Sequence, residues 1–205
     1  MAGVSEKRMI YYTADLHFGH RNVIQYCNRP WATVEEMNEG LVTRWNAVVR
    51  PEDTVYVLGD FSMNARDMEI WTPRLNGTKV LVVGNHDRCF RMQSAQVDRY
   101  LSAGWAHIID STFGKVGTHD VNCHHFPYQY DHPNQPVRYM NKRLPDLGIT
   151  LLHGHVHTEW LTRCTDSGTL MINVGVDVNN YCPVSEMQIA ALIDKQQVVA
   201  LSNGK

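Results

Sequence analysis

The stretch VLVVGNHD, residues 80–87, joins four consecutive apolar residues to a glycine, an amide, an imidazole and a carboxylate. A short run of Val and Leu that stops at a glycine is typical of a buried strand followed by a turn. Two more apolar runs end in the same manner, one before Asp15 and one before Gly59-Asp60. Polar groups that could carry chemistry therefore follow directly after strands.

Helices are predicted between the strands. Residues 33–49 place apolar side chains at three- and four-residue spacing, and Thr33 with Glu36 has the form of a capping box. Weaker patterns predict one helix within 65–75, one between the third and fourth strands, and a last one from Ser185. The six predicted strands cover residues 9–13, 54–58, 79–83, 121–124, 149–153 and 170–174. This alternation favours an α/β fold in which ligands bind beyond the carboxyl ends of the strands.

The composition is that of a globular protein. Of the 205 residues, 43% are hydrophobic and 20% are charged, so the chain can bury a full core without disulfides. The net charge of -2 gives no general attraction for nucleic-acid phosphates. The five cysteines include no C-x-x-C pair, and we expect reduced thiols. We expect one domain over residues 1–205 and a cytoplasmic location, because no apolar run has the length of a membrane span.

Most of the 11 histidines fall in short clusters. Two further predicted strands run into HH at 124–125 and into HGHVH at 153–157. Carboxylate, amide and imidazole donors without thiolates suit Mn, Fe, Zn, Ni or Co better than a structural zinc site. Because such clusters should meet at the carboxyl ends of the strands, we predict that they form a catalytic metal centre.

These blocks resemble those of the calcineurin-like metallophosphoesterases. D-x-H, G-D, G-N-H-[DE], H and G-H-x-H occur in this order over about residues 9–178. The longer forms DLHFGH, HGHVH and NVGVDVNNY are similar to those of small bacterial and phage members. The resemblance implies an α/β fold that consists of a single-domain, four-layer αββα sandwich with two mixed β-sheets.

The resemblance also implies a set of site residues and two divalent transition-metal ions, with Mn preferred and Fe, Zn, Ni or Co as alternatives. His125 is chosen over His124 because the family's ligand commonly precedes an aromatic-proline pair, which stands here at 126–127. His86 corresponds to the catalytic histidine, and Asp87 would orient it. The implied ligands are Asp15, His17, His157 and the shared Asp60 for one ion, and Asp60, Asn85, His125 and His155 for the other.

A centre of this kind has a clear chemical use. Two divalent ions about 3.5–4 Å apart would leave a net positive site, because Asp15 and Asp60 cancel only about two of about four charges. Coordination can lower the pKa of a water to about 7, so that a metal-bound hydroxide could attack phosphorus in line while His86 assists the departing oxygen. We therefore predict a binuclear phosphoesterase that hydrolyses a phosphodiester or phosphomonoester, with a nucleotide-like small molecule as the expected substrate.

Alternatives remain open from the sequence. A nuclease or cyclic-phosphodiester hydrolase acting on RNA or DNA ends would use the same chemistry, and a non-catalytic metal-binding scaffold module would use the same fold. A metallo-β-lactamase-like centre is disfavoured because Val156-His157 stand where that class requires Asp-His. The expected partner is a phosphoester small molecule, such as a nucleotide, or an RNA end, and neither a membrane nor an obligate protein partner is expected.

Three basic residues are candidates for substrate binding. His20 and Arg21 follow the first block closely enough to touch a substrate phosphate. Segment 128–147 contains three prolines and has neither a helical nor a strand period, so we predict a long loop beside the site, either a lid or a disordered segment. Arg138 lies within this loop and could contact a phosphate.

Overall fold

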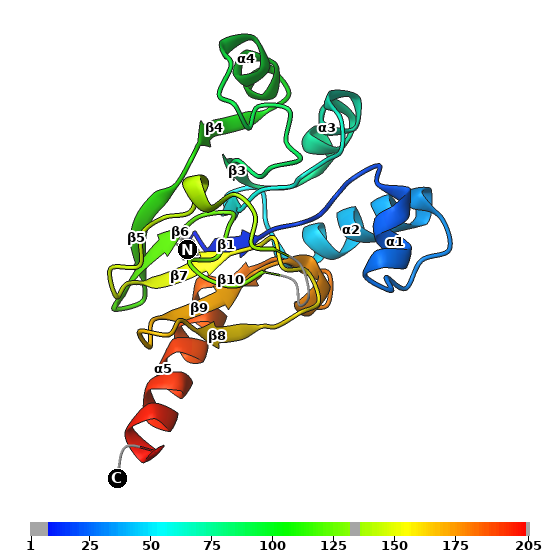
Figure 1. Ribbon diagram of the computed structural model, residues 1–205. Coiled ribbons are helices and arrows are strands. Elements are labelled where there is room, and N and C mark those ends of the chain that lie inside the picture. Colours follow the sequence, from blue (N-terminus) through cyan, green and yellow to red (C-terminus); the bar gives the residue numbers. More distant parts are fainter. Residues whose placement is uncertain (1–7, 132–135, 204–205) are drawn as a thin grey trace, which may run out of the picture.

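The computed structural model describes residues 8–131 and 136–203 and contains two five-stranded β-sheets (Figure 1). The strand order is β10-β1-β2-β3-β4 in the first sheet and β5-β6-β7-β9-β8 in the second. Each sheet combines parallel and antiparallel pairs. The predicted α/β sandwich with two mixed sheets is confirmed.

The first sheet brings three of the polar blocks to one edge. β1, β2, β3 and β4 are parallel, and the short strand β10 pairs antiparallel with β1. The carboxyl ends of β1, β2 and β3 therefore face the same way, and Asp15, Asp60 and Asn85 follow them. The strands are β1 (Ile10–Thr13), β2 (Thr54–Val57), β3 (Thr78–Val82), β4 (Trp105–Ile109) and β10 (Val184–Ser185).

The second sheet supplies the histidine blocks. Its central strands β6, β7 and β9 are parallel, whereas β5 and β8 pair antiparallel at the two edges. Beyond the ends of β1 and β9, an isolated parallel bridge joins Ala14 to Gly175, so the two sheets meet where the polar blocks emerge. The strands are β5 (Thr112–Val116), β6 (His119–Cys123), β7 (Thr150–His153), β8 (Thr162–Cys164) and β9 (Leu170–Asn173).

Two of the helices begin with the predicted caps. The Thr33 hydroxyl accepts the backbone N–H of Glu36 at 3.1 Å before α2, and the N–H of Ala32 donates to the Glu36 carboxylate. At the start of α5, the Gln188 backbone N–H donates to the Ser185 hydroxyl, and the Gln188 side chain accepts the Ser185 N–H. The α-helices are α1 (Arg21–Tyr26), α2 (Val34–Val48), α3 (Ala65–Trp71), α4 (Ser94–Ser102) and α5 (Glu186–Asn203).

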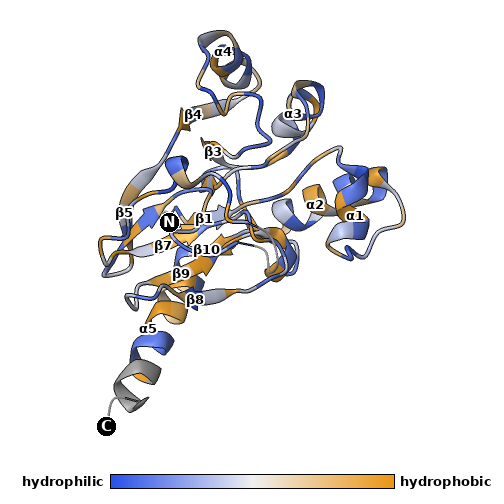
Figure 2. Cartoon of the chain, viewed as in Figure 1, coloured by the Kyte–Doolittle hydropathy of each residue, from blue (hydrophilic) through white to orange (hydrophobic). Residues whose placement is uncertain are grey.

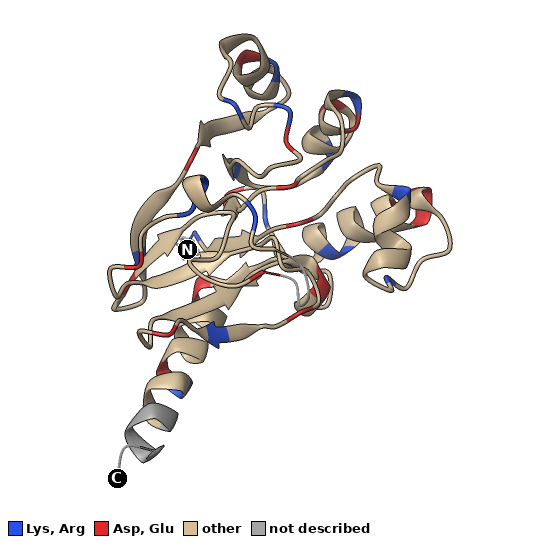
Figure 3. Cartoon of the chain, in the orientation of Figure 1, with Lys and Arg blue, Asp and Glu red and all other residues tan. Residues whose placement is uncertain are grey.

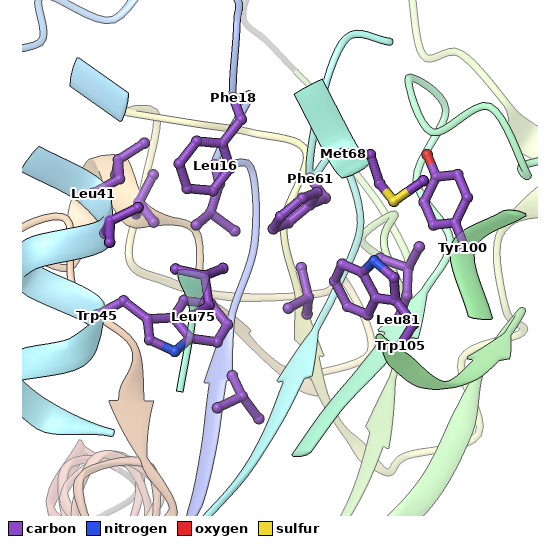
Figure 4. Packing of buried hydrophobic residues seen from close by; sticks show 14 of the residues in the cluster. Leu16, Phe18, Leu41, Trp45, Phe61, Met68, Leu75, Leu81, Tyr100 and Trp105 are labelled. Carbon is purple, nitrogen blue, oxygen red and sulfur yellow. The ribbon is translucent and has the colours of Figure 1, made fainter. Parts of the chain in front are cut away.

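Helices α2, α3 and α4 cover the outer face of the first sheet. Figure 4 shows Leu41 and Trp45 of α2, Met68 of α3 and Tyr100 of α4 packed with side chains of the sheet and its loops, including Leu81. Burial of each such side chain contributes roughly 1.5–3 kcal/mol. The loop residues Leu16, Phe18 and Phe61 join this cluster, so the core directly supports the segments that carry the first two blocks.

A second core lies between the sheets. It contains residues of both sheets, such as Val82 of β3 and Ile172 of β9, and is completed by Ile189 and Ile193 of α5. Hydrophobic colour is concentrated around β9 and β10 in Figure 2, and α5 continues away from the sheets toward the C-terminus (Figure 1). None of the helices in the described part of the chain has the length and apolar character that crossing a membrane requires.

The outer face of the second sheet packs against loop side chains. Leu151 of β7 and Met171 of β9 form a small cluster with Tyr128, and Leu144 and Trp160 pack against it. Among the described residues this layer replaces the outer helices that the resemblance implies. The long loop at 128–147 is thus partly a structural layer, with one 3-10 turn at Met140–Lys142, and its residues 132–135 lie outside the described part.

Candidate metal centre

Asp60 lies between two histidines that come from different sheets. Its Oδ2 is 3.7 Å from Nε2 of His17, which follows β1, and 3.4 Å from Nε2 of His125, which follows β6. Its Oδ1 accepts the backbone N–H of His86 at 2.8 Å. One oxygen of this carboxylate is therefore held by the backbone, and the other lies between two imidazoles.

Three groups of donor atoms among the described residues could each hold a metal ion, and within each group the atoms lie no more than 4.8 Å apart. Two consist of predicted ligands: Asp15, His17 and His157 form one, and Asp15, Asp60 and His125 form the other. These two groups share Asp15, so the two positions are adjacent. The third group combines His157 with Cys27 and Asp177, which were not predicted as ligands. Five of the seven predicted ligands thus converge, and their oxygen and nitrogen donors fit a divalent transition metal.

Several of these donor atoms are buried without a hydrogen bond. Within residues 8–131 and 136–203, no hydrogen-bond partner is found for Oδ1 of Asp15 or for either ring nitrogen of His17, although both residues are buried. A buried polar atom without a partner costs about 1–3 kcal/mol. A cation at this position would satisfy these atoms, so the residues fit the metal that the donor set implies.

The backbone at the site is strained. Five of the predicted ligands have a positive φ, a conformation that costs non-glycine residues about 1–3 kcal/mol each and is concentrated at functional sites. Gly154 permits a close approach, because a Cβ there would lie 2.5 Å from Oδ2 of Asp15. The residues with positive φ are Asp15 (57°), His17 (54°), Asp60 (53°), His155 (73°) and His157 (46°).

The charges at the site complement one another. Burial raises the pKa of Asp15 and lowers that of His17, which therefore favours the neutral form that can bind a metal. Although burial opposes its charge, the neighbouring His125 and His17 hold the pKa of Asp60 below its usual range. Burial likewise opposes a charge on His125, but the Asp60 carboxylate raises its pKa to about 9. In the metal-free protein, a proton on His125 provides positive charge beside Asp60. A bound divalent ion would provide this charge in its place.

The remaining predicted ligands, Asn85 and His155, stand beside His125. The Asn85 side-chain oxygen is 3.2 Å from Nε2 of His125, and the ring centroids of His125 and His155 are 5.2 Å apart. Burial lowers the pKa of His155 to about 4. Its Nε2 is 3.0 Å from the Asp131 carboxylate, and among the described residues it does not belong to a compact donor group.

The two predicted catalytic residues are separated in the structure. His86 is exposed, and its ring packs edge-on against that of His17, with 5.3 Å between the centroids. We predicted that Asp87 orients this ring. Its carboxylate instead accepts the backbone N–H groups of Gly84, Asp60 and Phe61 at 2.8–3.0 Å. Burial and the Asp60 charge raise the pKa of Asp87 to about 7, while the backbone N–H bonds oppose this shift.

A cavity of about 440 Å³ opens beside the donor groups. Of the predicted substrate-binding residues, His20 and Arg138 line it, whereas Arg21 is exposed one position further along, on the first turn of α1. The ring of His20 lies 5.2 Å from that of His17. The cavity is lined by His17, His20, Val23, Tyr26, Cys27, His86, Arg138, His157, Thr158 and Glu159.

Two carboxylates at the site were not predicted as functional. Asp177 contacts Nδ1 of His157 at 2.7 Å, and Asp131 lies against His155. Asp177 falls within the NVGVDVNNY block, but asparagine and aspartate near turns are common, so the sequence alone did not distinguish it. Asp131 stands in the loop without periodicity, where no local pattern marks it.

No family model matches the chain. A Methanocaldococcus jannaschii protein, "Uncharacterized protein MJ1445", is 34% identical over 208 residues, which cover 96% of this chain and 97% of that protein. The gene 66 protein of Mycobacterium phage L5 is 33% identical over 181 residues, covering 82% and 86% of the two chains.

Among solved structures, the protein of unknown function AQ665 from Aquifex aeolicus has a TM-score of 0.68 and 28% identity, and the match covers 91% of this chain and all of that one. A solved archaeal phosphodiesterase is less similar, with a TM-score of 0.41 and 19% identity over 82% of this chain and 83% of that one. The fold is therefore shared over nearly the whole chain with AQ665.

Proposed function

This chain belongs to the family of the Methanocaldococcus jannaschii protein MJ1445 and the mycobacteriophage gene 66 proteins, and we propose that it is a metal-dependent phosphoester hydrolase. The observation that carries the proposal is the position of Asp60, with Oδ2 3.7 Å from His17 and 3.4 Å from His125. Buried atoms of Asp15 and His17 that lack a hydrogen bond within the described residues support a metal at that place.

In this proposal two divalent ions bind side by side, with Mn as the first choice. Asp15, His17 and His157 would hold one ion, Asn85, His125 and His155 the other, and Asp60 would bind both. Bound ions would supply positive charge for the phosphate oxygens and would lower the pKa of a coordinated water. The neutral imidazole ligands preserve that positive charge, which two carboxylates would cancel only in part.

His86 is the proposed general acid. It is exposed, lines the cavity, and packs against the proposed ligand His17 without belonging to either donor group. An imidazole at this place can donate a proton to the departing oxygen or stabilise its charge. His20 and Arg138 line the same cavity and would contact other phosphate oxygens.

A small phosphoester is the proposed substrate class. The cavity of about 440 Å³ has the size of sites that bind small molecules, and a nucleotide-like compound would fit such a volume. Basic and acidic residues are interspersed along the described part of the chain (Figure 3), a distribution that does not favour binding of a long nucleic acid. Diester or monoester preference is left to experiment.

The test combines metal analysis with turnover. The purified protein is assayed for bound metal and then for hydrolysis of bis-p-nitrophenyl phosphate and p-nitrophenyl phosphate with Mn, Ni, Zn, Fe and Mg. We expect about two ions per chain, with turnover lost in Asp60→Asn and retained in Asp120→Asn, an exposed carboxylate paired with Lys115. Absence of both metal and turnover from the folded wild type would reject the proposal.

A further inference from the structure

The ring nitrogen Nδ1 of His157 contacts a carboxylate that is itself paired with an arginine. Asp177 accepts two hydrogen bonds from Arg29, at 2.7 and 3.0 Å, and its Oδ2 is 2.7 Å from Nδ1 of His157. Arg29 also donates to the backbone oxygens of Asp15 and Leu16 at 2.7 and 2.8 Å. This arginine therefore connects His157 to the strained segment that carries the other donors of the first group.

A second pair has the same arrangement around His155. Asp131 lies 3.0 Å from Nε2 of His155 through Oδ1, and its Oδ2 accepts a hydrogen bond from Arg143 at 2.8 Å. Arg143 also donates to the backbone oxygens of Pro127 and Tyr130, each at 2.8 Å. Since Pro127 stands two residues after His125, the second arginine connects His155 to the segment that carries His125.

Both pairs are almost wholly inside the protein. The side chains of Arg29 and Asp177 are fully buried, and those of Arg143 and Asp131 are each 2% exposed. A buried ion pair gains little net stability over apolar packing, because two charges lose their hydration. Two such pairs, each placed behind one histidine of the HGHVH block, indicate a role in positioning rather than in general stability.

We propose that Asp177 with Arg29, and Asp131 with Arg143, are positioning residues that each fix one imidazole for one of the two metal ions. This inference rests on the proposed metal centre. A carboxylate behind a metal-binding histidine fixes its ring orientation and tautomer and strengthens it as a ligand. The contacts indicate that His157 presents Nε2 and His155 presents Nδ1 to the metals.

The loop at 128–147 acquires a defined role from this proposal. Arg143 fixes the described part of the loop to the backbone beside His125, and Asp131 projects from it to His155. Asp131 and Arg143 of this loop would then form part of the wall of the second metal site. Substitution at Asp131 should consequently affect metal binding, whereas substitution of a loop residue outside this network should not.

The test measures Mn²⁺ binding by isothermal titration to Asp177→Asn, Asp131→Asn, the double variant and the control Asp146→Asn. Asp146 lies in the same loop but accepts hydrogen bonds from the hydroxyls of Thr165 and Ser167, which do not belong to this network. Removal of such a carboxylate typically weakens metal binding about 10- to 100-fold. In each single variant we expect the Kd of one ion to rise by this factor. In the double variant the Kd of both ions should rise, and in the control neither should change.

A second readout is independent of bound metal. In the chelator-treated protein, NMR should detect a slowly exchanging proton on Nδ1 of His157 that disappears in Asp177→Asn and persists in Asp131→Asn.

Equally weakened binding of both ions in each single variant, together with a lowered melting temperature, would mean general destabilisation and would overturn the inference. So would wild-type Mn²⁺ affinity in the single variants, which would leave the phosphoesterase proposal intact. Failure of the wild type to bind metal would reject that proposal, while the NMR signal would still decide whether Asp177 positions His157.

Discussion

The Asp60 carboxylate binds the backbone of His86 rather than its imidazole ring. Oδ1 of Asp60 accepts the His86 N–H at 2.8 Å, while the His86 ring turns outward to the cavity. Because the His86 backbone N–H makes the bond, any residue except proline at position 86 can preserve it. Asp60 can therefore stay in place when the imidazole is removed, which allows the proposed metal binding and the proposed catalytic role of His86 to be tested separately.

His86→Ala should lower turnover by about 100-fold or more while bound metal stays at the wild-type level, because only the acid or electrostatic help of the imidazole is lost. Steady-state hydrolysis of the nitrophenyl esters and metal content measure the two effects. His107→Ala, an exposed histidine on β4, serves as the control and should behave as wild type. Loss of metal from His86→Ala would instead make His86 a ligand.

Asp87→Ala should act mainly on stability. The substitution leaves the N–H groups of Gly84, Asp60 and Phe61 without their buried acceptor, which should lower the free energy of unfolding by about 3 kcal/mol or more. Urea unfolding measures this, with Asp98→Ala, an exposed position on α4, as the control. Unchanged stability with strongly reduced turnover would support the original assignment of Asp87 to catalysis.

The parts of the fold that could be predicted depend on local patterns. The caps at Thr33 and Ser185 involve partners three residues away, and the central strands are nearly continuous apolar runs. Strands β4, β5, β8 and β10 and helix α1 were not predicted. β5 lies at a sheet edge and exposes Phe113 (59%), and β10 has only two residues, so neither presents the apolar run of a buried strand.

The site was predictable to the extent that its residues occur in blocks. That the polar residues directly following the strands lie close together could be predicted from the sequence, because parallel strands bring their carboxyl ends together. The supporting contacts could not: Arg29 and Asp177 are 148 positions apart. Asp87 was assigned to His86 because they are adjacent in sequence, but adjacency does not determine where a carboxylate points.

Gly154→Ala should disrupt the centre without introducing a charge. The new Cβ would lie 2.5 Å from both Oδ2 of Asp15 and Cβ of Ala14, so Asp15 or the strand end must move. We expect reduced metal content and a loss of about 1–3 kcal/mol in unfolding free energy, as overpacking typically costs. Gly114→Ala on β5 is the matched control, since its Cβ would meet nothing within 4 Å. Equal metal content in the two variants would contradict the close packing of Gly154 on Asp15.

His124 should make the metal-free protein sensitive to acid. Burial lowers its pKa to about 4, below the usual 6.5, so the unfolded state binds the extra proton first and stability falls as the pH drops from about 6.5 to about 4. The full pKa shift corresponds to about 3 kcal/mol of unfolding free energy.

The variant His124→Asn tests this prediction. Its amide oxygen can accept the Phe126 N–H that Nδ1 of His124 accepts at 3.2 Å in the wild type, and the amide does not titrate. Urea unfolding in chelator at pH 4 and pH 7.5 should therefore show a smaller acid-induced loss in this variant than in the wild type or in the exposed control His107→Asn. Parallel pH dependence in all three proteins would show that His124 does not titrate in this range.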